Sequence, residues 1–139
     1  MKIIQVVGRS NSGKTTFIRN LVPVLKERGP VAVIKHLGDH EYQLEPGKDT
    51  TLFFDAGADV AIGIDSQKSV AVIRKNTLES MLDQLLEQQI DFVIIEGFKQ
   101  KPFPKIVIGS LTIDHCILRD PDCNDVVASL HHFTEYPAP

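Results

Sequence analysis

Three short segments of the chain are apolar at successive positions and rich in β-branched residues. They are residues 3–7, 31–34 and 92–95. A strand needs continuous apolar character when both of its faces are covered, as in a parallel sheet. These segments therefore predict buried parallel strands. Shorter apolar runs predict further strands at residues 60–64, 69–73, 105–108 and 114–118.

Helical patterns alternate with these strands. Residues 14–28 place Phe17, Ile18, Leu21 and Leu25 on one stripe. Asn76, with Glu79 three positions later, is typical of a capping box that begins a second amphipathic helix. Two shorter helices are expected at residues 49–56 and 125–133.

The alternation of helices and buried strands predicts an α/β fold with a mostly parallel, twisted sheet and flanking helices. The strands at 60–64 and 69–73 are separated by only four residues, too few for a crossover helix. We therefore expect an antiparallel hairpin on an otherwise parallel sheet. With 139 residues and no internal repeat, we expect a single domain over residues 1–139.

Composition and charge exclude several classes of protein. A formal net charge of -3 gives no broad attraction to nucleic acid or to an anionic membrane. Cys116 and Cys123 are too few for a disulfide scaffold and are not spaced as a zinc pair. No apolar run approaches the ~20 residues of a membrane helix, and the start of the chain lacks the pattern of a signal peptide. We expect a cytoplasmic protein.

The segment from Gly8 to Thr15, GRSNSGKT, fits the pattern G-x-x-x-x-G-K-[ST] between a buried strand and a helix. This segment is called the phosphate loop below. Its glycines let successive backbone N–H groups point at phosphate oxygens, and the helix N-terminus adds positive charge. Lys14 would contact the β- and γ-phosphates and act in catalysis, and the Thr15 hydroxyl would bind Mg²⁺. The predicted nucleotide-binding residues are Gly8, Arg9, Ser10, Asn11, Ser12, Gly13, Lys14, Thr15 and Thr16.

A phosphate loop needs a carboxylate at the end of a neighbouring strand, to hold Mg²⁺ or to orient the attacking water. Glu96 directly follows the buried strand at 92–95 and is assigned this catalytic and metal-binding role. The alternative is an ordinary acidic residue at a strand end. Arg9 could reach the nucleotide of a dimer partner, but a solvated loop arginine is the favoured interpretation.

Lys35 and His36 follow the strand at 31–34, so we expect them at the carboxyl edge of the sheet, where ligands bind. They are candidates for contacts to a phosphate or to the anionic group of a second substrate. His40 lies four residues after His36, but Gly38 argues against the helix that a metal-binding pair would need. A structural or solvated role is favoured for His40.

Taken together, these segments resemble the molybdopterin-guanine dinucleotide biosynthesis protein B (MobB) family. The resemblance covers nearly the whole chain and rests on an ordered set of motifs. They are SGKTT at 12–16, VIKH at 33–36, PGKDT at 46–50, AGA at 56–58 and IIEGFK at 94–99. The sequence departs from the family where Leu37, Gly38 and Asp39 stand in place of further histidines, and where Leu52 and Phe53 replace an arginine.

The resemblance implies a small, dimeric, Mg²⁺-dependent GTP-binding protein that hydrolyses GTP slowly. Members of the family assist the enzyme that joins guanosine monophosphate to molybdopterin, acting as adaptors. By this resemblance, Lys35, His36, Lys48 and Asp49 line a cleft for a second anionic ligand, with molybdopterin as a candidate. Guanine preference rests on the resemblance alone, because the sequence contains no N-K-x-D motif.

Two other functions stay open at this point. The first is a small ATP-dependent kinase or ligase-like enzyme, although no arginine lies between residues 31 and 73 to stabilise a transferring phosphoryl group. The second is a metal-insertion GTPase, in which His36 and His40 would be entry ligands. A comparison of GTP and ATP binding would separate the kinase from the GTP-binding adaptor.

Overall fold

The computed structural model describes residues 1–138 and divides the chain into two compact units. Unit 1 consists of Met1–Gly38 and Gln84–Pro139, and unit 2 of Asp39–Asp83. The single domain expected from the chain length stays a prediction. None of the helices within residues 1–138 is both long and apolar enough to cross a bilayer.

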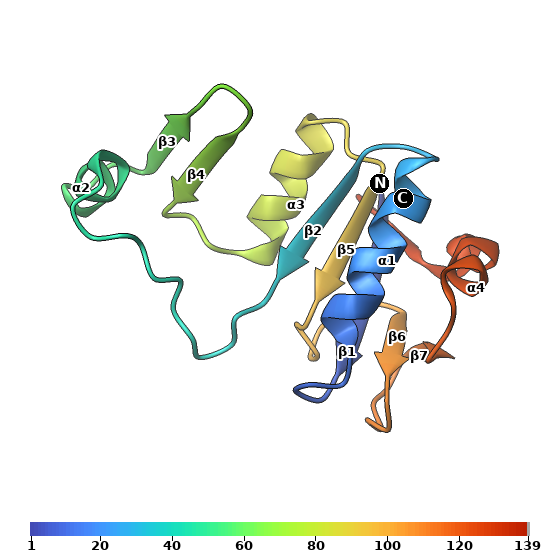
Figure 1. Cartoon of the computed structure of the whole chain (residues 1–139). Helices are drawn as coiled ribbons and strands as arrows, with labels where there is room; N and C mark the ends of the chain where they lie inside the picture. The colour runs from blue at the N-terminus through green and yellow to red at the C-terminus, as the bar shows by residue number, and fades with distance from the viewer. Residues whose placement is uncertain (139) are drawn as a thin grey trace. The chain divides into compact units, whose positions relative to one another are not determined.

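Unit 1 is built on a parallel sheet in which the strand order is β2-β5-β1-β6-β7 (Figure 1). A short strand, β8, pairs antiparallel with β1. The bounds are β1 Lys2–Gly8, β2 Val31–Lys35, β5 Phe92–Glu96, β6 Lys105–Ile108, β7 Cys116–Arg119 and β8 Thr134–Glu135. The mostly parallel sheet predicted from the buried apolar runs is confirmed.

The last parallel strand was expected at 114–118, but it begins two residues later and ends at Arg119. His115 has a backbone φ of 62°, in the left-handed region that extended strands do not use. Residues 114 and 115 therefore belong to the turn before β7. The two-residue strand β8 was not predicted, because it is too short to show a periodic pattern.

Two helices cover one face of this sheet. α1 spans Lys14–Lys26 and buries Ile18, Leu21 and Leu25 against apolar side chains of the central strands. α4 spans Cys123–Ala128 and packs beside α1. The final helix was expected at 125–133, but α4 begins earlier and is followed by a separate 3₁₀ turn, Leu130–His132. The earlier start follows from a capping box between Asp122 and Asp125.

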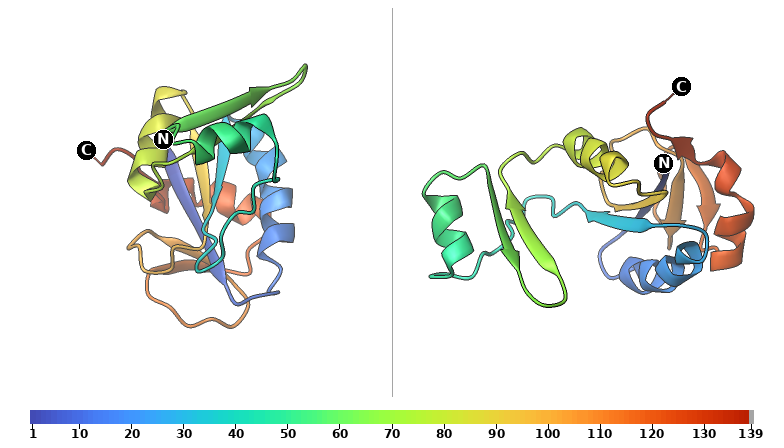
Figure 2. Two further views of the ribbon diagram at one scale, coloured as in Figure 1. Left: turned by 90° about the vertical axis from the view of Figure 1, so that its left-hand side faces the viewer. Right: turned by 90° about the horizontal axis from the view of Figure 1, so that it is seen from above.

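Unit 2 contains α2, Asp49–Asp55, and the antiparallel strands β3, Val60–Ile64, and β4, Ser69–Ile73. The bounds of both strands were predicted correctly. The hairpin does not extend the parallel sheet, however: β3 and β4 form a two-stranded sheet of their own. The right-hand view of Figure 2 shows α2 beside β3. At the turn, hydrogen bonds from Lys68 and Gln67 lower the pKa of Asp65.

Helix α3, Leu78–Glu87, crosses from unit 2 into unit 1. It buries Leu78 and Leu82, as its amphipathic pattern predicted. The predicted cap was Asn76, but the Thr77 side-chain oxygen accepts a hydrogen bond from the backbone N–H of Ser80 at 3.2 Å. Thr77 is therefore the capping residue, because the helix begins one position later than a cap at Asn76 would place it.

Candidate functional site: the phosphate loop and its carboxylate

The phosphate loop connects the end of β1 to the start of α1. Two of its residues have left-handed backbone conformations, Gly13 with φ 97° and Asn11 with φ 58°. At Gly8 the constraint is space, because an added Cβ would lie 2.5 Å from Ser12 Oγ and 2.6 Å from the carbonyl oxygen of Ile108. Only glycine fits a position so close to neighbouring atoms. The loop therefore curls tightly at the carboxyl end of a central strand.

Lys14, the first residue of α1, folds back over the loop. Its ammonium donates to the carbonyl oxygen of Arg9 at 2.7 Å and to that of Gly8 at 3.4 Å. The same nitrogen lies 3.8 Å from Glu96 Oε1. The phosphate-loop lysine and the predicted carboxylate are therefore neighbours in the structure, although they are 82 positions apart in the sequence.

Glu96 ends β5, which lies beside β1, and this places its carboxylate next to the phosphate loop. Lys35, its register partner on β2, approaches Glu96 Oε2 with its ammonium at 3.5 Å. The Glu96 side chain is 13% exposed, so it is largely shielded yet still open to a ligand. Two ammonium groups thus stand beside one carboxylate, an arrangement that suits an anionic ligand and a hydrated cation.

A pocket of about 600 Å³ opens at this edge of the sheet, within the range of small-molecule sites. The phosphate loop contributes Gly8, Ser10 and Lys14 to its wall, and β5 contributes Glu96. His36 and the segment after β5 supply other parts of the wall. It is lined by Val7, Gly8, Ser10, Lys14, His36, Leu37, Gly38, Glu96, Gly97, Phe98, Lys99, Gln100 and Lys101.

The imidazole of His36 stacks on the ring of Phe98, with ring centroids 4.1 Å apart and an interplanar angle of 19°. Gly97 makes this approach possible: its φ is 95°, and an added Cβ would lie 2.9 Å from the Cβ of His36. The stacking fixes the His36 ring at the wall of the pocket. His36 is therefore where the sequence placed it, at the carboxyl edge of the sheet.

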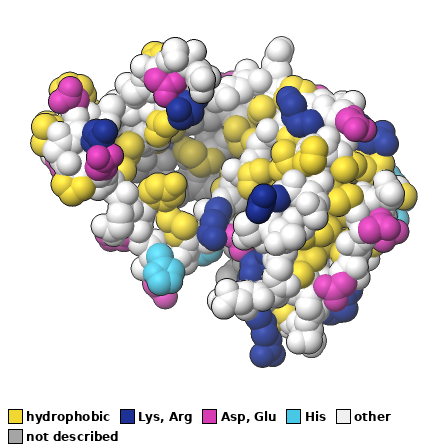
Figure 3. Space-filling model, in the orientation of Figure 1, with side chains coloured by type: hydrophobic (Ala, Val, Ile, Leu, Met, Phe, Trp, Pro, Cys, Tyr) yellow, Lys and Arg dark blue, Asp and Glu magenta, His cyan; other side chains and the backbone are white. Residues whose placement is uncertain are grey.

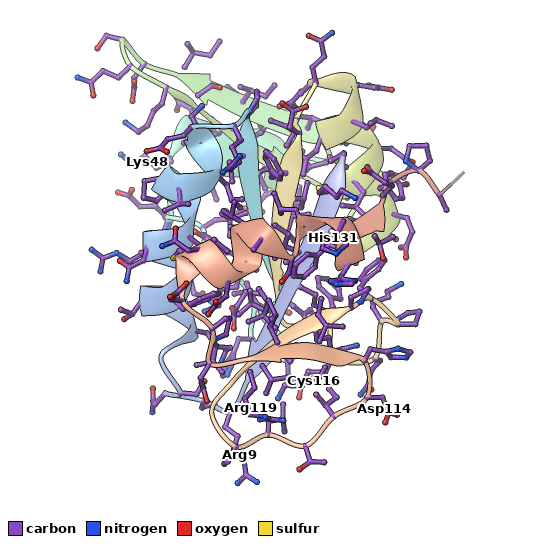
Figure 4. The ribbon with its side chains drawn as sticks, turned by 90° about the vertical axis from the view of Figure 1, so that its right-hand side faces the viewer. Arg9, Lys48, Asp114, Cys116, Arg119 and His131 are labelled. Atoms are coloured by element: carbon purple, nitrogen blue, oxygen red, sulfur yellow. The ribbon has the colours of Figure 1, made fainter. Side chains whose placement is uncertain are left out.

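The remaining loop residues differ in exposure. Arg9 is exposed, and Figure 4 shows it projecting from the phosphate loop away from the sheet. Thr15 and Thr16 are exposed at the start of α1. Ser12 Oγ, by contrast, is buried and has no hydrogen-bond partner among the described residues. An unpaired buried hydroxyl is costly, so it is suited to a ligand oxygen.

The donor set at this edge fits Mg²⁺. The ion prefers oxygen ligands, keeps several waters and is held by one or two protein groups together with phosphate oxygens. The Thr15 hydroxyl at the start of α1 and the Glu96 carboxylate supply such oxygens. A cluster of three or more acidic, histidine or cysteine side chains is absent from residues 1–138, and a magnesium site of this kind does not need one.

Lys48 and Asp49 belong to unit 2. They stand at the start of α2 in unit 2, where Lys48 approaches the carboxylate of Glu45 at 3.5 Å. Lys35 and His36 belong to unit 1. A cleft lined by all four residues thus stays a prediction. His40, also in unit 2, is exposed.

The segment 97–104 forms much of the pocket wall, and its role was not predicted from the sequence. Two buried polar side chains hold it to the sheet. Gln5, on β1, donates to the carbonyl oxygens of Gly97 at 2.7 Å and Phe98 at 2.8 Å. Lys105, on β6, donates to those of Lys101 at 2.7 Å and Phe103 at 3.1 Å. Gln5, a glutamine inside an otherwise apolar strand, was the signal in the sequence that could have indicated that β1 holds another segment by hydrogen bonds.

Comparison with known proteins shows the family of this chain. The family model described as "Molybdopterin guanine dinucleotide synthesis protein B" matches residues 3–130. The chain belongs to the MobB family. It is 34% identical over 131 residues to a putative molybdopterin-guanine dinucleotide biosynthesis adapter protein of Methanocaldococcus jannaschii, covering 91% of this chain and 51% of the relative. It is 39% identical over 112 residues to a probable adapter protein of the same description from Bacillus subtilis, covering 78% and 65%.

Solved structures of the MobB family share the fold. A crystal structure of Bacillus subtilis MobB superposes with a TM-score of 0.70 at 30% identity, covering all of this chain and 88% of that one. The MobB homologue from Bacillus stearothermophilus gives 0.58 at 26% identity, covering 96% and 73%. The parallel sheet with flanking helices and a small antiparallel pair is thus the MobB fold. The chain spans 51% and 65% of the lengths of the two curated relatives described above.

Proposed function

We propose that this chain binds GTP together with Mg²⁺ at the phosphate loop and hydrolyses it slowly. We further propose that it acts in the cytoplasm as an adapter in molybdopterin guanine dinucleotide biosynthesis. One observation carries the nucleotide-binding proposal: Lys14 and Glu96, at the ends of two neighbouring elements, bring an ammonium and a carboxylate within 3.8 Å at the phosphate loop. The names of the related proteins support the adapter role.

The side chains at the loop have distinct tasks in this proposal. Lys14 exchanges its contacts with the loop carbonyls for phosphate oxygens and neutralises their charge. The backbone N–H groups of the loop and the start of α1 bind the remaining oxygens. Glu96 accepts a hydrogen bond from a water molecule and orients it towards the terminal phosphate. The His36 ring, stacked on Phe98, limits the access of bulk water to the pocket.

Magnesium belongs to this proposal through Thr15 and Glu96, which would hold it directly or through water. When bound, the ion neutralises charge on the phosphate oxygens. The two lysines beside Glu96 help to hold its carboxylate in place. Slow turnover is expected because none of the residues that line the pocket is an arginine, the side chain that stabilises charge developing on a transferred phosphoryl group.

The partners proposed are the molybdopterin guanylyltransferase and a second anionic ligand, for which molybdopterin is the candidate. Lys35 and His36 stand at the pocket edge where such an anion would meet positive charge. Lys48 and Asp49 belong to the same predicted cleft. The related proteins are named as adapters in biosynthesis of the dinucleotide, and this supports a partner in that pathway.

We also propose a homodimer formed through unit 2. Val60, Ile62 and Ile64 alternate along one face of β3 and are 47%, 56% and 82% exposed. Figure 3 shows apolar side chains on the surface of the part that holds α2, β3 and β4. Monomeric proteins rarely expose a contiguous apolar face of this kind. Light scattering after size exclusion should give twice the 15.5 kDa chain mass, with Ile64→Glu monomeric and Ile117→Glu, on β7, still dimeric.

The nucleotide proposal is tested by calorimetric titration with GTP and with ATP in the presence of Mg²⁺. We expect GTP to bind at least ~10-fold tighter, a difference of ~1.4 kcal/mol. In the Lys14→Ala variant GTP binding should be lost, whereas Lys26→Ala, at the exposed end of the same helix, should bind normally. Preferential binding of ATP would instead support a kinase-like enzyme. Unchanged GTP affinity in Lys14→Ala would contradict the assignment of the phosphate loop as the nucleotide-binding site.

A further inference from the structure

A second pocket, of about 190 Å³, adjoins the 600 Å³ pocket at the phosphate loop and shares residues 99–101 with it. The phosphate loop does not line it. Its chemically active lining groups are Lys99, Lys101, Lys105, Asp114 and His115. Three lysines thus face one aspartate, so the lining is cationic. The nucleotide site uses none of the side chains of Lys105, Asp114 or His115.

The central group of this pocket is the ammonium of Lys105, whose side chain is almost fully buried at 1% exposure. An ammonium has three N–H donors. Two of them bind the carbonyl oxygens of Lys101 and Phe103, which leaves one N–H without a partner among residues 1–138. Within the part of the chain that the structure describes, no carboxylate forms an ion pair with Lys105. A buried charge without a counter-ion is expensive.

The direction of the Lys105 pKa shift is that of an ammonium without a carboxylate close to it. Burial lowers the pKa of Lys105, and the Asp114 carboxylate opposes this shift only through its charge at a distance. Figure 4 shows Asp114 on the loop that leads into β7. Lys99 and Lys101 add like charge at the rim. A bound anion would stabilise the buried ammonium of Lys105, because it would place negative charge beside it.

We propose that this pocket is a phosphate-binding site separate from the phosphate loop, with Lys105 as the buried anchor and Lys99 at the rim. Its volume is about 190 Å³, against about 600 Å³ for the pocket at the phosphate loop. It therefore has room for one tetrahedral anion with a little water, but not for a nucleotide. Inorganic phosphate and the phosphate end of a larger molecule share this chemistry. The proposal does not depend on GTP binding.

The test uses the full chain carrying Lys14→Ala, so that the phosphate loop does not contribute. Inorganic phosphate and glycerol phosphate are titrated separately and followed by calorimetry and ³¹P NMR. We expect one site per chain. Tighter binding of the monoester identifies the phosphate end of a larger molecule, and equal or tighter binding of inorganic phosphate identifies the free ion. Either result supports the site, whereas the absence of binding of both probes at about 10 mM overturns it.

Two further variants locate the binding. In the same background, Lys105→Met should abolish phosphate binding, and Lys99→Ala should weaken it about 3- to 10-fold, since each removes a charge-assisted hydrogen bond. Lys26→Met, on the exposed end of α1, is the matched control and should bind normally. Circular dichroism reports whether Lys105→Met folds; if it does not, the exposed Lys99→Ala decides. Unchanged affinity in Lys99→Ala, or in folded Lys105→Met, contradicts the proposal.

Discussion

Gln5 and Lys105 are register partners on the adjacent strands β1 and β6, and both hold the same segment of chain. Gln5 is fully buried and donates to the carbonyl oxygens of Gly97 and Phe98. Lys105 donates to those of Lys101 and Phe103. The segment 97–104 has no strand or helix of its own. Two side chains of the sheet therefore hold the segment that lines the pocket at the phosphate loop.

The Gln5→Leu variant should lower the free energy of unfolding by about 1–3 kcal/mol, because two partly buried carbonyl oxygens of the segment lose their hydrogen-bond donor. Denaturant unfolding measures this difference. Gln88→Ala, at an exposed position, is the control and should change stability by less than about 0.5 kcal/mol. Equal stability of Gln5→Leu and the wild type would show that the segment does not depend on Gln5.

Glu96→Gln should keep GTP affinity within a few-fold but slow hydrolysis by roughly 10²-fold, because the amide is a poor base for the attacking water. Single-turnover assays separate the hydrolysis step from binding. Glu87→Gln, exposed at the end of α3, provides the control and should hydrolyse GTP at the native rate. Native turnover in Glu96→Gln would assign the role of Glu96 to another group.

Gly8→Ala should weaken GTP binding by at least about 10-fold, or ~1.4 kcal/mol, since the new methyl group would collide with Ser12 Oγ and with the Ile108 carbonyl. The second neighbour is backbone and cannot rotate away. Gly63→Ala serves as the control, because its Cβ would meet only Thr50 Cγ2 at an ordinary 3.5 Å. Calorimetry with GTP compares the two variants, and tight binding by Gly8→Ala would mean that the loop can relax.

The two ends of the described chain are joined through Glu135. Lys2 approaches its carboxylate at 2.8 Å, and this hydrogen bond, helped by the N-terminal ammonium, lowers the pKa of Glu135 below the ordinary value of 4.5. Its stabilising effect is therefore present above pH 4.5 and is lost as the pH falls through the lower folded-state pKa.

The stability difference between the wild type and Glu135→Gln should accordingly shrink on acidification from about pH 6 to about pH 3. Thermal unfolding at several pH values measures it. Lys2→Met removes the hydrogen-bond donor and should make the free energy of unfolding depend less on pH over the same range. A difference that stays constant with pH would mean that the carboxylate is not coupled to Lys2.

The sequence was sufficient where the physical cause is local. The tight loop between β1 and α1 was predicted from the spacing of Gly8, Gly13 and Lys14, and the structure has this loop; phosphate binding there stays a prediction. The bounds of β3 and β4 followed from apolar runs broken by a short polar turn. Glu96 was placed correctly because parallel strands end at a common edge.

Apart from the helix starts at α3 and α4, which depend on local caps, the differences from prediction involve partners that are distant in sequence or backbone states that side chains do not reveal. The bonds from Gln5 to Gly97 and Phe98 span more than 90 residues. The late start of β7 depends on the left-handed backbone of His115. The separation of the β3–β4 hairpin from the main sheet depends on which strand edges meet, and the two hairpin strands alone do not encode it.

The way Gln5 and Lys105 hold the pocket wall has a consequence for variation. Their hydrogen bonds end on carbonyl oxygens, which every amino acid possesses, and not on the side chains of Phe98 or Lys101. Replacing those side chains would alter what the wall recognises but leave its anchorage intact. The segment is thus suited to acquiring new ligand preferences by substitution, while the sheet beneath it stays the same.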